Sequence, residues 1–372
     1  MRGAGQSIEL QSIRGLAAML VLLHHCLSYY SLDAAFHHAA EILLNAHAAV
    51  VTFFVLSGYV LTLSLLRGGF DPGALRQFYL RRLFRIYPAI WLSSLCGLLA
   101  VAFVLGRWQV PNQSPWFAGL FSPGGFTFRN VFASFAGTGT YLNPPLWSIM
   151  VELVGSSLMP LFAVALRHRP MIFAGILLAL AGVSFLDFGS LILVLTARYA
   201  VCFAIGASIV VWHAPFGRWF DRRGARLAAL ACVLLLLFFR TTGGWRFADE
   251  YNAPLPGLVE SLAAALLMAL VVGRRDAFAF LVARPLAFLG EISYSLYLLH
   301  FLVMAVVAEL AGGWLGLPLF WGTPASAFLL ALATAGLTLP AAALVYRWVE
   351  LPCMALGRKW TAPRRAAAGN PG

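Results

Sequence analysis

Residues 46–66 read AHAAVVTFFVLSGYVLTLSLL, an apolar run without Asp, Glu, Lys or Arg. As a helix rising 1.5 Å per residue this run covers about 31 Å, which matches the ~30 Å hydrocarbon core of a bilayer. Across all 372 residues, 61% are hydrophobic and 11% are charged, whereas about 25% are charged in a typical soluble domain. A soluble protein could not bury so much apolar surface. The composition therefore excludes an ordinary globular enzyme, a disordered chain and a nucleic-acid-binding domain, and it indicates a polytopic membrane protein.

The predicted fold is all-α with about ten transmembrane helices. Lipid offers no partners to loose backbone groups, and no run shows the alternation of a barrel strand, so each span must be a helix. The expected spans are 8–30, 46–66, 86–106, 146–166, 171–187, 191–212, 226–240, 256–273, 286–309 and 325–348. The fifth and seventh are short for a bilayer, so we expect a count of ten with an error of about one.

The basic residues orient these spans. With the N-terminus inside, nineteen Lys and Arg residues fall on the inner side and four, Arg107, Arg129, Arg240 and Arg246, on the outer side. This positive-inside bias predicts both termini in the cytoplasm and location in the cytoplasmic (inner) membrane. We therefore attribute the net charge of +12 to membrane topology and to contact with anionic lipid or an anionic cofactor. We expect no nucleic-acid partner.

The chain reads as one integral-membrane domain over residues 1–361, followed by a disordered tail at 362–372. The longest loop, near 107–145, is external, and a long ordered loop is often functional. Five cysteines show no metal-ligand spacing and read as small core residues. His37, His38, Glu41 and His47 lie in or near the first external loop, where a solvated loop is the better interpretation than a metal site. We therefore expect no metal.

The first span carries two polar residues that a bilayer disfavours, Arg14 and His25. They are eleven residues apart, so they share one helix face about 16 Å apart along the axis. One face then presents a cation toward the cytoplasm and a base toward the exterior. In the simpler alternative, Arg14 reaches lipid phosphate and His25 caps the span.

A basic cluster, Arg81, Arg82 and Arg85, stands at the cytoplasmic entry to the third span. Arg81 and Arg85 are four apart and share a helix face. Such a cluster can hold phosphates through bidentate hydrogen bonds. Composition alone favours plain positive-inside anchoring.

The fourth span opens with Trp147 and Ser148 and carries Glu152 in its outer half, at roughly the depth of His25. Glu152 and Ser148 are four apart and face the same way. A carboxylate there could orient the His25 imidazole. The alternative is a structural ion pair with Arg14 or with Arg198 of the sixth span.

Tyr294, Tyr297 and His300 recur every three residues along the ninth span. Buried hydroxyl and imidazole groups need partners. The stripe is therefore either a hydrogen-bonded seam between helices or the wall of a site.

Together these motifs resemble the membrane acyltransferase 3 family, whose members O-acetylate or otherwise acylate cell-surface glycans. The resemblance covers most of the chain, with six elements in order. They are Ile13-Arg14-Gly15-Leu16-Ala17-Ala18 followed by His25; Phe53-Phe54-Val55-Leu56-Ser57-Gly58-Tyr59; Arg81-Arg82-x-x-Arg85-Ile86-Tyr87-Pro88; Trp147-Ser148 with Glu152; Ser293-Tyr294-x-x-Tyr297-x-x-His300; and Glu350-x-Pro352. Many members carry an acid three positions before the Arg, where this chain has Gln11, so any role of that acid is in doubt here.

The resemblance implies an O-acyltransferase that moves an acyl group, usually acetyl, from cytoplasmic acyl-CoA to a hydroxyl of a cell-envelope or secreted glycan or a lipid-linked sugar. In that picture His25 is the catalytic base, Glu152 supports it, and Arg14 and Arg85 help to bind the donor. Acyl-CoA is a substrate, and no permanently bound cofactor is expected.

In the resulting mechanistic hypothesis, the CoA phosphates bind to Arg81, Arg82 and Arg85. His25 then deprotonates the acceptor hydroxyl or first takes the acyl group itself. Ser57, Tyr294 or Trp147 could stabilise the oxyanion, while Ser148, Tyr297 and His300 would line the substrate site. The alternatives are a proton-coupled transporter or flippase of a glycan or small metabolite, and a sensor without turnover. A transporter would release no thiol from acyl-CoA.

Overall fold

The computed structural model describes residues 7–121, 123–245 and 250–361, and these ranges are all-α, without a β-strand. The predicted tail at 362–372 lies outside them. Within them, nine helical segments are long and apolar enough to cross a membrane. Six are single helices: α1 (Ile8–Leu27), α4 (Pro72–Phe103), α7 (Leu146–His168), α9 (Leu191–Arg218), α10 (Arg222–Thr242) and α12 (Pro254–Gly273). The all-α polytopic fold is confirmed.

The other three spans are compound. α2 (Ala34–Leu43) leads into α3 (Ala46–Gly68), and α13 (Arg284–Ala308) continues through the π-helix η3 (Glu309–Trp314). α14 (Pro324–Val345) continues through the π-helix η5 (Tyr346–Glu350) into α15 (Leu351–Trp360). The short helices α5 (Pro115–Leu120), η1 (Pro123–Gly125), α6 (Phe128–Phe135), η2 (Arg275–Val282) and η4 (Pro318–Phe320) connect them.

Several observed helices differ in length from the expected spans. The seventh span, expected to be short at 226–240, is the 21-residue α10. The run 171–187 corresponds to α8 (Pro170–Val183), whose 14 residues are too few for a full span. The run 86–106 overlaps α4, which begins at Pro72 and ends at Phe103. Asp71 starts α4 because its carboxylate accepts from the Gly73 and Ala74 N–H groups and Pro72 suits the first turn. The basic cluster therefore lies on a helix that continues into the membrane.

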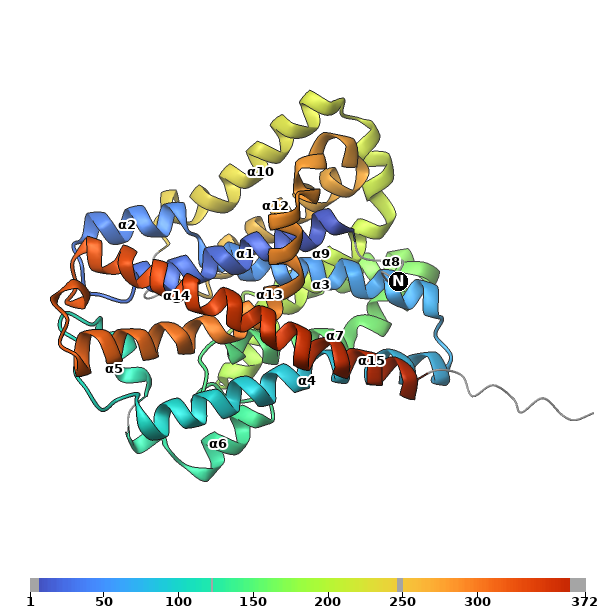
Figure 1. The fold of residues 1–372 in the computed structure, drawn as a ribbon. Helices are drawn as coiled ribbons and strands as arrows, with labels where there is room; N and C mark the ends of the chain where they lie inside the picture. Colours follow the sequence, from blue (N-terminus) through green and yellow to red (C-terminus); the bar gives the residue numbers. More distant parts are fainter. Residues whose placement is uncertain (1–6, 122, 246–249, 362–372) are drawn as a thin grey trace, which may run out of the picture.

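The helices α1, α3, α13 and α14 run side by side across the bundle (Figure 1). α1 and α13 meet at two glycines: a Cβ on Gly15 would lie 2.5 Å from the Gly290 nitrogen, and Gly290 in turn lies against the Gln11 backbone. Only glycine allows backbones to approach so closely in a membrane bundle. The contact fixes the helix that carries His25 against the helix that carries His300.

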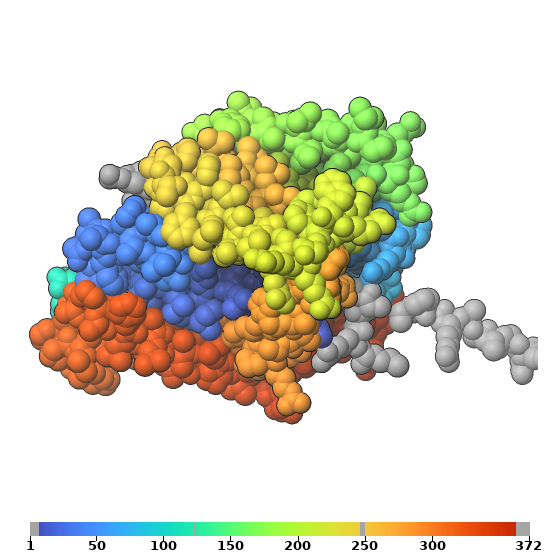
Figure 2. Space-filling model, turned by 90° about the horizontal axis from the view of Figure 1, so that it is seen from above, coloured from blue at the N-terminus to red at the C-terminus, as the bar shows by residue number. Residues whose placement is uncertain are grey.

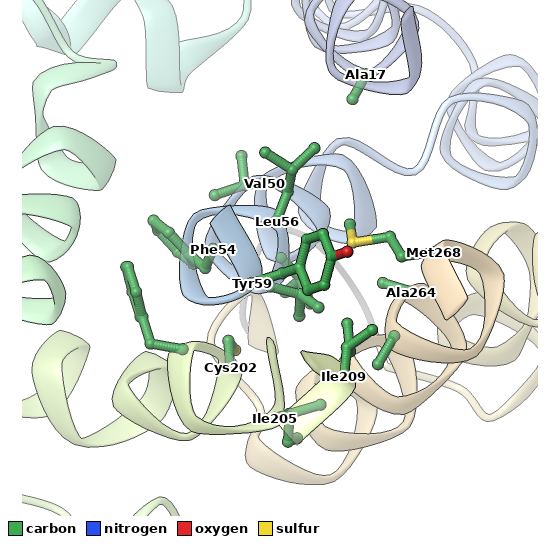
Figure 3. Close-up of a cluster of buried hydrophobic side chains, with 14 of the residues drawn as sticks. Ala17, Val50, Phe54, Leu56, Tyr59, Cys202, Ile205, Ile209, Ala264 and Met268 are labelled. Carbon is green, nitrogen blue, oxygen red and sulfur yellow. The ribbon is translucent and has the colours of Figure 1, made fainter. Parts of the chain in front are cut away.

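α3 lies in the centre of the larger core cluster (Figure 3). Its Phe54 and Tyr59 face Cys202 and Ile209 of α9, with Met268 of α12 beside them (Figure 3). The five cysteines are free thiols, and three of them are buried in the bundle, in agreement with their interpretation as small apolar residues. This core holds one wall of the cavity described next.

Candidate active site

A cavity of about 450 Å³ lies between α3, α4, α7 and α13. Most of the predicted site residues line it: Arg14, Ser57, Arg81, Arg82, Arg85, Ser148, Glu152, Tyr294 and Tyr297. His25, Trp147 and His300 are not among its lining residues. Four arginines and two glutamates, Glu152 and Glu291, face it, while α3 contributes an apolar wall that includes Phe53 and Leu61. The cavity therefore suits an anionic ligand with an apolar extension.

Each arginine of the basic cluster has a side-chain partner, and that of Arg82, Glu152, also lines the cavity. Arg82 Nη2 donates to Glu152 Oε1 at 2.8 Å, and Arg85 Nη1 donates to Glu350 Oε2 at 2.5 Å. Arg81 is exposed, and its Nε donates to the Thr361 hydroxyl at 2.9 Å. The three arginines thus line the cavity together, with Arg81 exposed and Arg82 and Arg85 partly buried.

Arg14 joins α1 to α13 from within the cavity. Its Nε donates to Ser293 Oγ at 2.7 Å, and its Nη2 donates to the Gly290 carbonyl at 3.0 Å. These partners are neutral, so the positive charge of Arg14 stays available to a ligand. The Arg14 side chain thus bonds to α13, whereas the simpler alternative expected it to reach lipid phosphate.

Glu152 lies beside Arg82 and not beside the His25 imidazole. Its carboxylate accepts from Arg82, and Ser57 Oγ lies 3.5 Å from Glu152 Oε1. The ion pair with Arg82 takes the place of the expected contact between Glu152 and His25. It also takes the place of the alternative ion pair of Glu152 with Arg14 or Arg198. The sequence analysis expected Glu152 at the depth of His25, but its partner depends on how α4 crosses α7, which the sequence does not reveal.

His25 pairs instead with His300. Nδ1 of His25 lies 3.0 Å from Nε2 of His300, and the two rings stack with centroids 5.2 Å apart. His300 Nδ1 lies 2.7 Å from the Tyr297 carbonyl, which can only accept. The proton of a neutral His300 therefore sits on Nδ1, and its Nε2 accepts from His25 Nδ1–H. That tautomer, assigned from the partners, leaves a lone pair on His25 Nε2.

The long loop near 107–145 reaches this histidine pair through Phe301. Phe301 packs edge-on against the His25 ring at 5.2 Å. Phe117 of α5 stacks on Phe301 at 5.5 Å, and Trp116 contacts the same ring at 6.1 Å. The Pro- and aromatic-rich loop thus places a short helix against Phe301.

Tyr297 stands between the cavity and the histidine pair. Its side chain lines the cavity, and its carbonyl accepts from His300. The Ser148 hydroxyl donates to the Pro145 carbonyl, so the 2.7 Å contact between Ser148 and Tyr297 is donated by the tyrosine. Phe53 packs edge-on against the same ring at 5.6 Å. Tyr294 and Tyr297 thus form part of the cavity wall, whereas His300 belongs to the seam between α13 and α1.

Comparisons with known proteins address the chemistry of this arrangement. A family model described as "Acyltransferase domain", of the acyltransferase 3 type, matches residues 7–347. The chain belongs to the acyltransferase 3 family.

Two curated relatives are similar to this acyltransferase. "Acyltransferase MdmB" of Streptomyces mycarofaciens is 27% identical over 347 residues, which cover 84% of this chain and 82% of the relative. "Protein 2 in picA locus" of Rhizobium radiobacter is 29% identical over 163 residues, which cover 40% of this chain and 77% of the relative. No solved structure matches.

Two predicted residues of this acyltransferase occupy other places. Trp147 packs among aromatic rings, at 5.6 Å from Tyr199 and 5.9 Å from Tyr251. His47, expected in or near a loop, is buried inside α3, where its Nδ1 contacts Glu260. Within the described ranges no cluster of three His, Cys, Asp or Glu side chains could hold a metal.

Sequence reasoning missed one polar network in this acyltransferase. The buried Glu260 carboxylate accepts from Asn45 Nδ2 at 2.9 Å and from Arg240 Nε at 3.3 Å, in addition to its contact with His47. The sequence signal that could have revealed this network was Glu260, a glutamate inside the apolar run 256–273. Arg240 was assigned to an outer loop, although α10 carries it to a position with no exposed surface.

A second missed residue is Glu350, which lies in the Glu350-x-Pro352 element. η5 ends at this residue and turns it inward, where it is fully buried and accepts from Ser295 and Arg85. A π-helix shifts the side chains that follow it relative to an α-helix. The tail motif therefore supports the basic cluster.

Proposed function

We propose that this acyltransferase moves an acyl group, acetyl in the simplest case, from a CoA thioester to a hydroxyl of a cell-envelope or secreted glycan. One observation carries the proposal. Four arginines gather in one cavity, and Tyr297 of the same cavity holds His300, which in turn holds His25. A site for an anionic donor and a base thus lie on the two sides of one tyrosine.

The donor enters from the arginine-rich end, which we assign to the cytoplasm of a cell whose inner membrane holds the protein. CoA phosphates rest against Arg81, Arg82 and Arg85, because guanidinium groups bind phosphate oxygens in pairs. The apolar wall that includes Phe53 and Leu61 takes the pantetheine arm. The thioester passes Tyr297 to reach His25.

The acceptor is activated by His25. Its Nε2 takes the proton of the sugar hydroxyl while the oxygen attacks the thioester carbonyl. His300 Nε2 accepts from the Nδ1–H throughout and so stabilises the imidazolium that forms. The tetrahedral intermediate collapses, the C–S bond breaks, and the CoA thiolate takes the proton from His25. General-base help of this kind contributes ~10²–10⁴-fold in rate.

Ser57 is the oxyanion candidate with the least committed hydroxyl, but it lines the cavity on the arginine side of Tyr297 and not the side of His25. Tyr294 donates its proton to the Ile86 carbonyl at 3.0 Å, and Trp147 does not line the cavity. Ser57 lies 3.5 Å from Glu152, a separation too long for a strong hydrogen bond, so its hydroxyl is open to a group of the bound donor. Glu152 acts on the donor side of the site by holding Arg82.

The test is thiol release from acetyl-CoA by the purified protein in lipid, with an envelope-glycan extract as acceptor. We expect His25→Ala to lose at least 100-fold in transfer while it retains acetyl-CoA binding. His38→Ala is the matched control, because His38 is exposed on α2. Near-normal transfer by His25→Ala would overturn the assignment of the base. No release from the unaltered protein, with binding intact and several donors tried, would favour a transporter.

A further inference from the structure

A second cavity, of about 470 Å³, lies between α10 and the helices α1, α3 and α12. Leucine, isoleucine, valine, phenylalanine and alanine side chains form most of its walls, and polar groups come from Asn45, Thr52 and Arg226. Figure 2 looks onto this face and shows α1 in blue between α10 in yellow and η2 in orange. Water would find few partners along such walls, so hydrocarbon is the filling expected in a bilayer.

One end of the groove carries a cation. Arg226 Nε donates to the Ala277 carbonyl at 2.9 Å, which fixes the guanidinium at the rim. The neighbouring acid, Asp276, is already held by Arg222 at 2.6 Å and by Arg274 at 3.1 Å. No acidic side chain in the described ranges pairs with Arg226. Its two terminal nitrogens can therefore donate to an anion.

The length of the groove fits one lipid chain. Along α10 the lining residues run from Arg226 to Leu237. Eleven residues at 1.5 Å each give about 16 Å, roughly half of the ~30 Å bilayer core. That is the depth of one leaflet.

We propose that this groove binds one acyl chain of an anionic phospholipid, with the lipid phosphate on Arg226. Juxtamembrane basic residues attract anionic lipid on the cytoplasmic side, and Arg222, Arg223 and Arg226 begin α10 at that end. The chain packs against Leu16 and Leu20 on α1. The lipid thereby fills the space between α10 and the helix that carries His25. This inference does not depend on the acyl donor or the acceptor.

The test is native mass spectrometry of the full chain in detergent, titrated with phosphatidylglycerol or phosphatidylcholine. We expect one tightly held phosphatidylglycerol, bound at least ~10-fold more tightly than phosphatidylcholine, because the choline cation of phosphatidylcholine offsets the attraction of its phosphate to Arg226. Arg226→Gln should weaken phosphatidylglycerol about tenfold. Arg223→Gln, which removes the same charge three residues away and outside the groove, should change little. Equal weakening by both variants, or no preference between the lipids, would overturn the proposal.

A second pair of variants tests the groove itself. Leu230 lines it, whereas Leu227, exposed on the same helix, does not. Leu230→Trp should reduce both phosphatidylglycerol binding and the rise in unfolding temperature that this lipid produces, and Leu227→Trp should change neither. Unchanged binding in Leu230→Trp would place the lipid elsewhere. A dimer in the unaltered protein that Leu230→Trp separates would make the groove a protein interface and would also refute the proposal.

Discussion

Nδ1 of His25 lies 3.0 Å from Nε2 of His300, across the interface between α1 and α13. The partner of His300 on its other side is a backbone carbonyl, which cannot titrate or rotate away. The imidazole of His25 is thus held by a second imidazole where many enzymes use a carboxylate. A neutral partner avoids placing an anion in the hydrocarbon region, where charge is costly.

His300 should act as a positioning residue. In His300→Ala the Nδ1–H of His25 loses its acceptor, so we expect kcat to fall about 100-fold with the donor KM unchanged. His300→Gln should lose less, because its amide oxygen can accept the same proton. Steady-state kinetics of the purified variants check this. A change in thermal stability with kcat intact would reduce His300 to a packing residue.

Arg85 should have two separable roles. Arg85→Ala leaves the fully buried Glu350 carboxylate without its cation, which should cost about 3–5 kcal/mol of stability. Arg85→Ala combined with Glu350→Gln should recover most of that stability, while the donor KM stays raised. Thermal unfolding and donor titration of both variants separate the effects. If the double variant also regains donor affinity, Arg85 does not bind phosphate.

The contact between α1 and α13 should tolerate no side chain at Gly15. A methyl group there would meet the backbone of Leu289 and Gly290, so Gly15→Ala should cost at least ~2 kcal/mol and reduce acyl transfer. Gly336→Ala in α14 is the matched control, since nothing lies within 4 Å of its added Cβ. That control should gain about 0.5–1 kcal/mol. Equal effects of the two substitutions on unfolding would contradict the close approach.

Acid should break the ion pair between Arg222 of α10 and Asp276 of η2. Hydrogen bonding to Arg222 and Arg274 holds the pKa of Asp276 below its usual value. The pair therefore stabilises the protein above the unfolded-state pKa of about 4, and this contribution is lost as the pH falls through the lower folded-state pKa. We expect Asp276→Asn to lower the unfolding temperature slightly at pH 7. The difference from the unaltered protein should vanish at pH 3, and a difference that grows on acidification would contradict the assigned sign.

The transmembrane fold could be predicted because it follows from local properties of the sequence. Apolar length marks most of the spans. Prediction failed at the start of α4, because the arginines from Arg76 to Arg85 lower the hydropathy of its first turns. Spacing alone could place Arg14 and His25 on one face.

The side-chain contacts within the candidate site could not be predicted from the sequence. Glu152 was expected at the depth of His25, but the crossing of α4 and α7 pairs it with Arg82 in the cavity that His25 does not line. His300 was identified as part of a stripe, yet its contact with His25 requires α13 to be the neighbour of α1. That neighbour is selected by Gly15 and Gly290, whose significance appears only when both helices are seen together.

The two glycines also limit how substrates can meet. Arg14 ties α1 to α13 at one level, the glycine contact adds backbone against backbone, and His25 touches His300 farther along. Two helices joined at two heights in this way move as one unit, so any motion that admits a substrate has to take place between this pair and the other helices of the bundle.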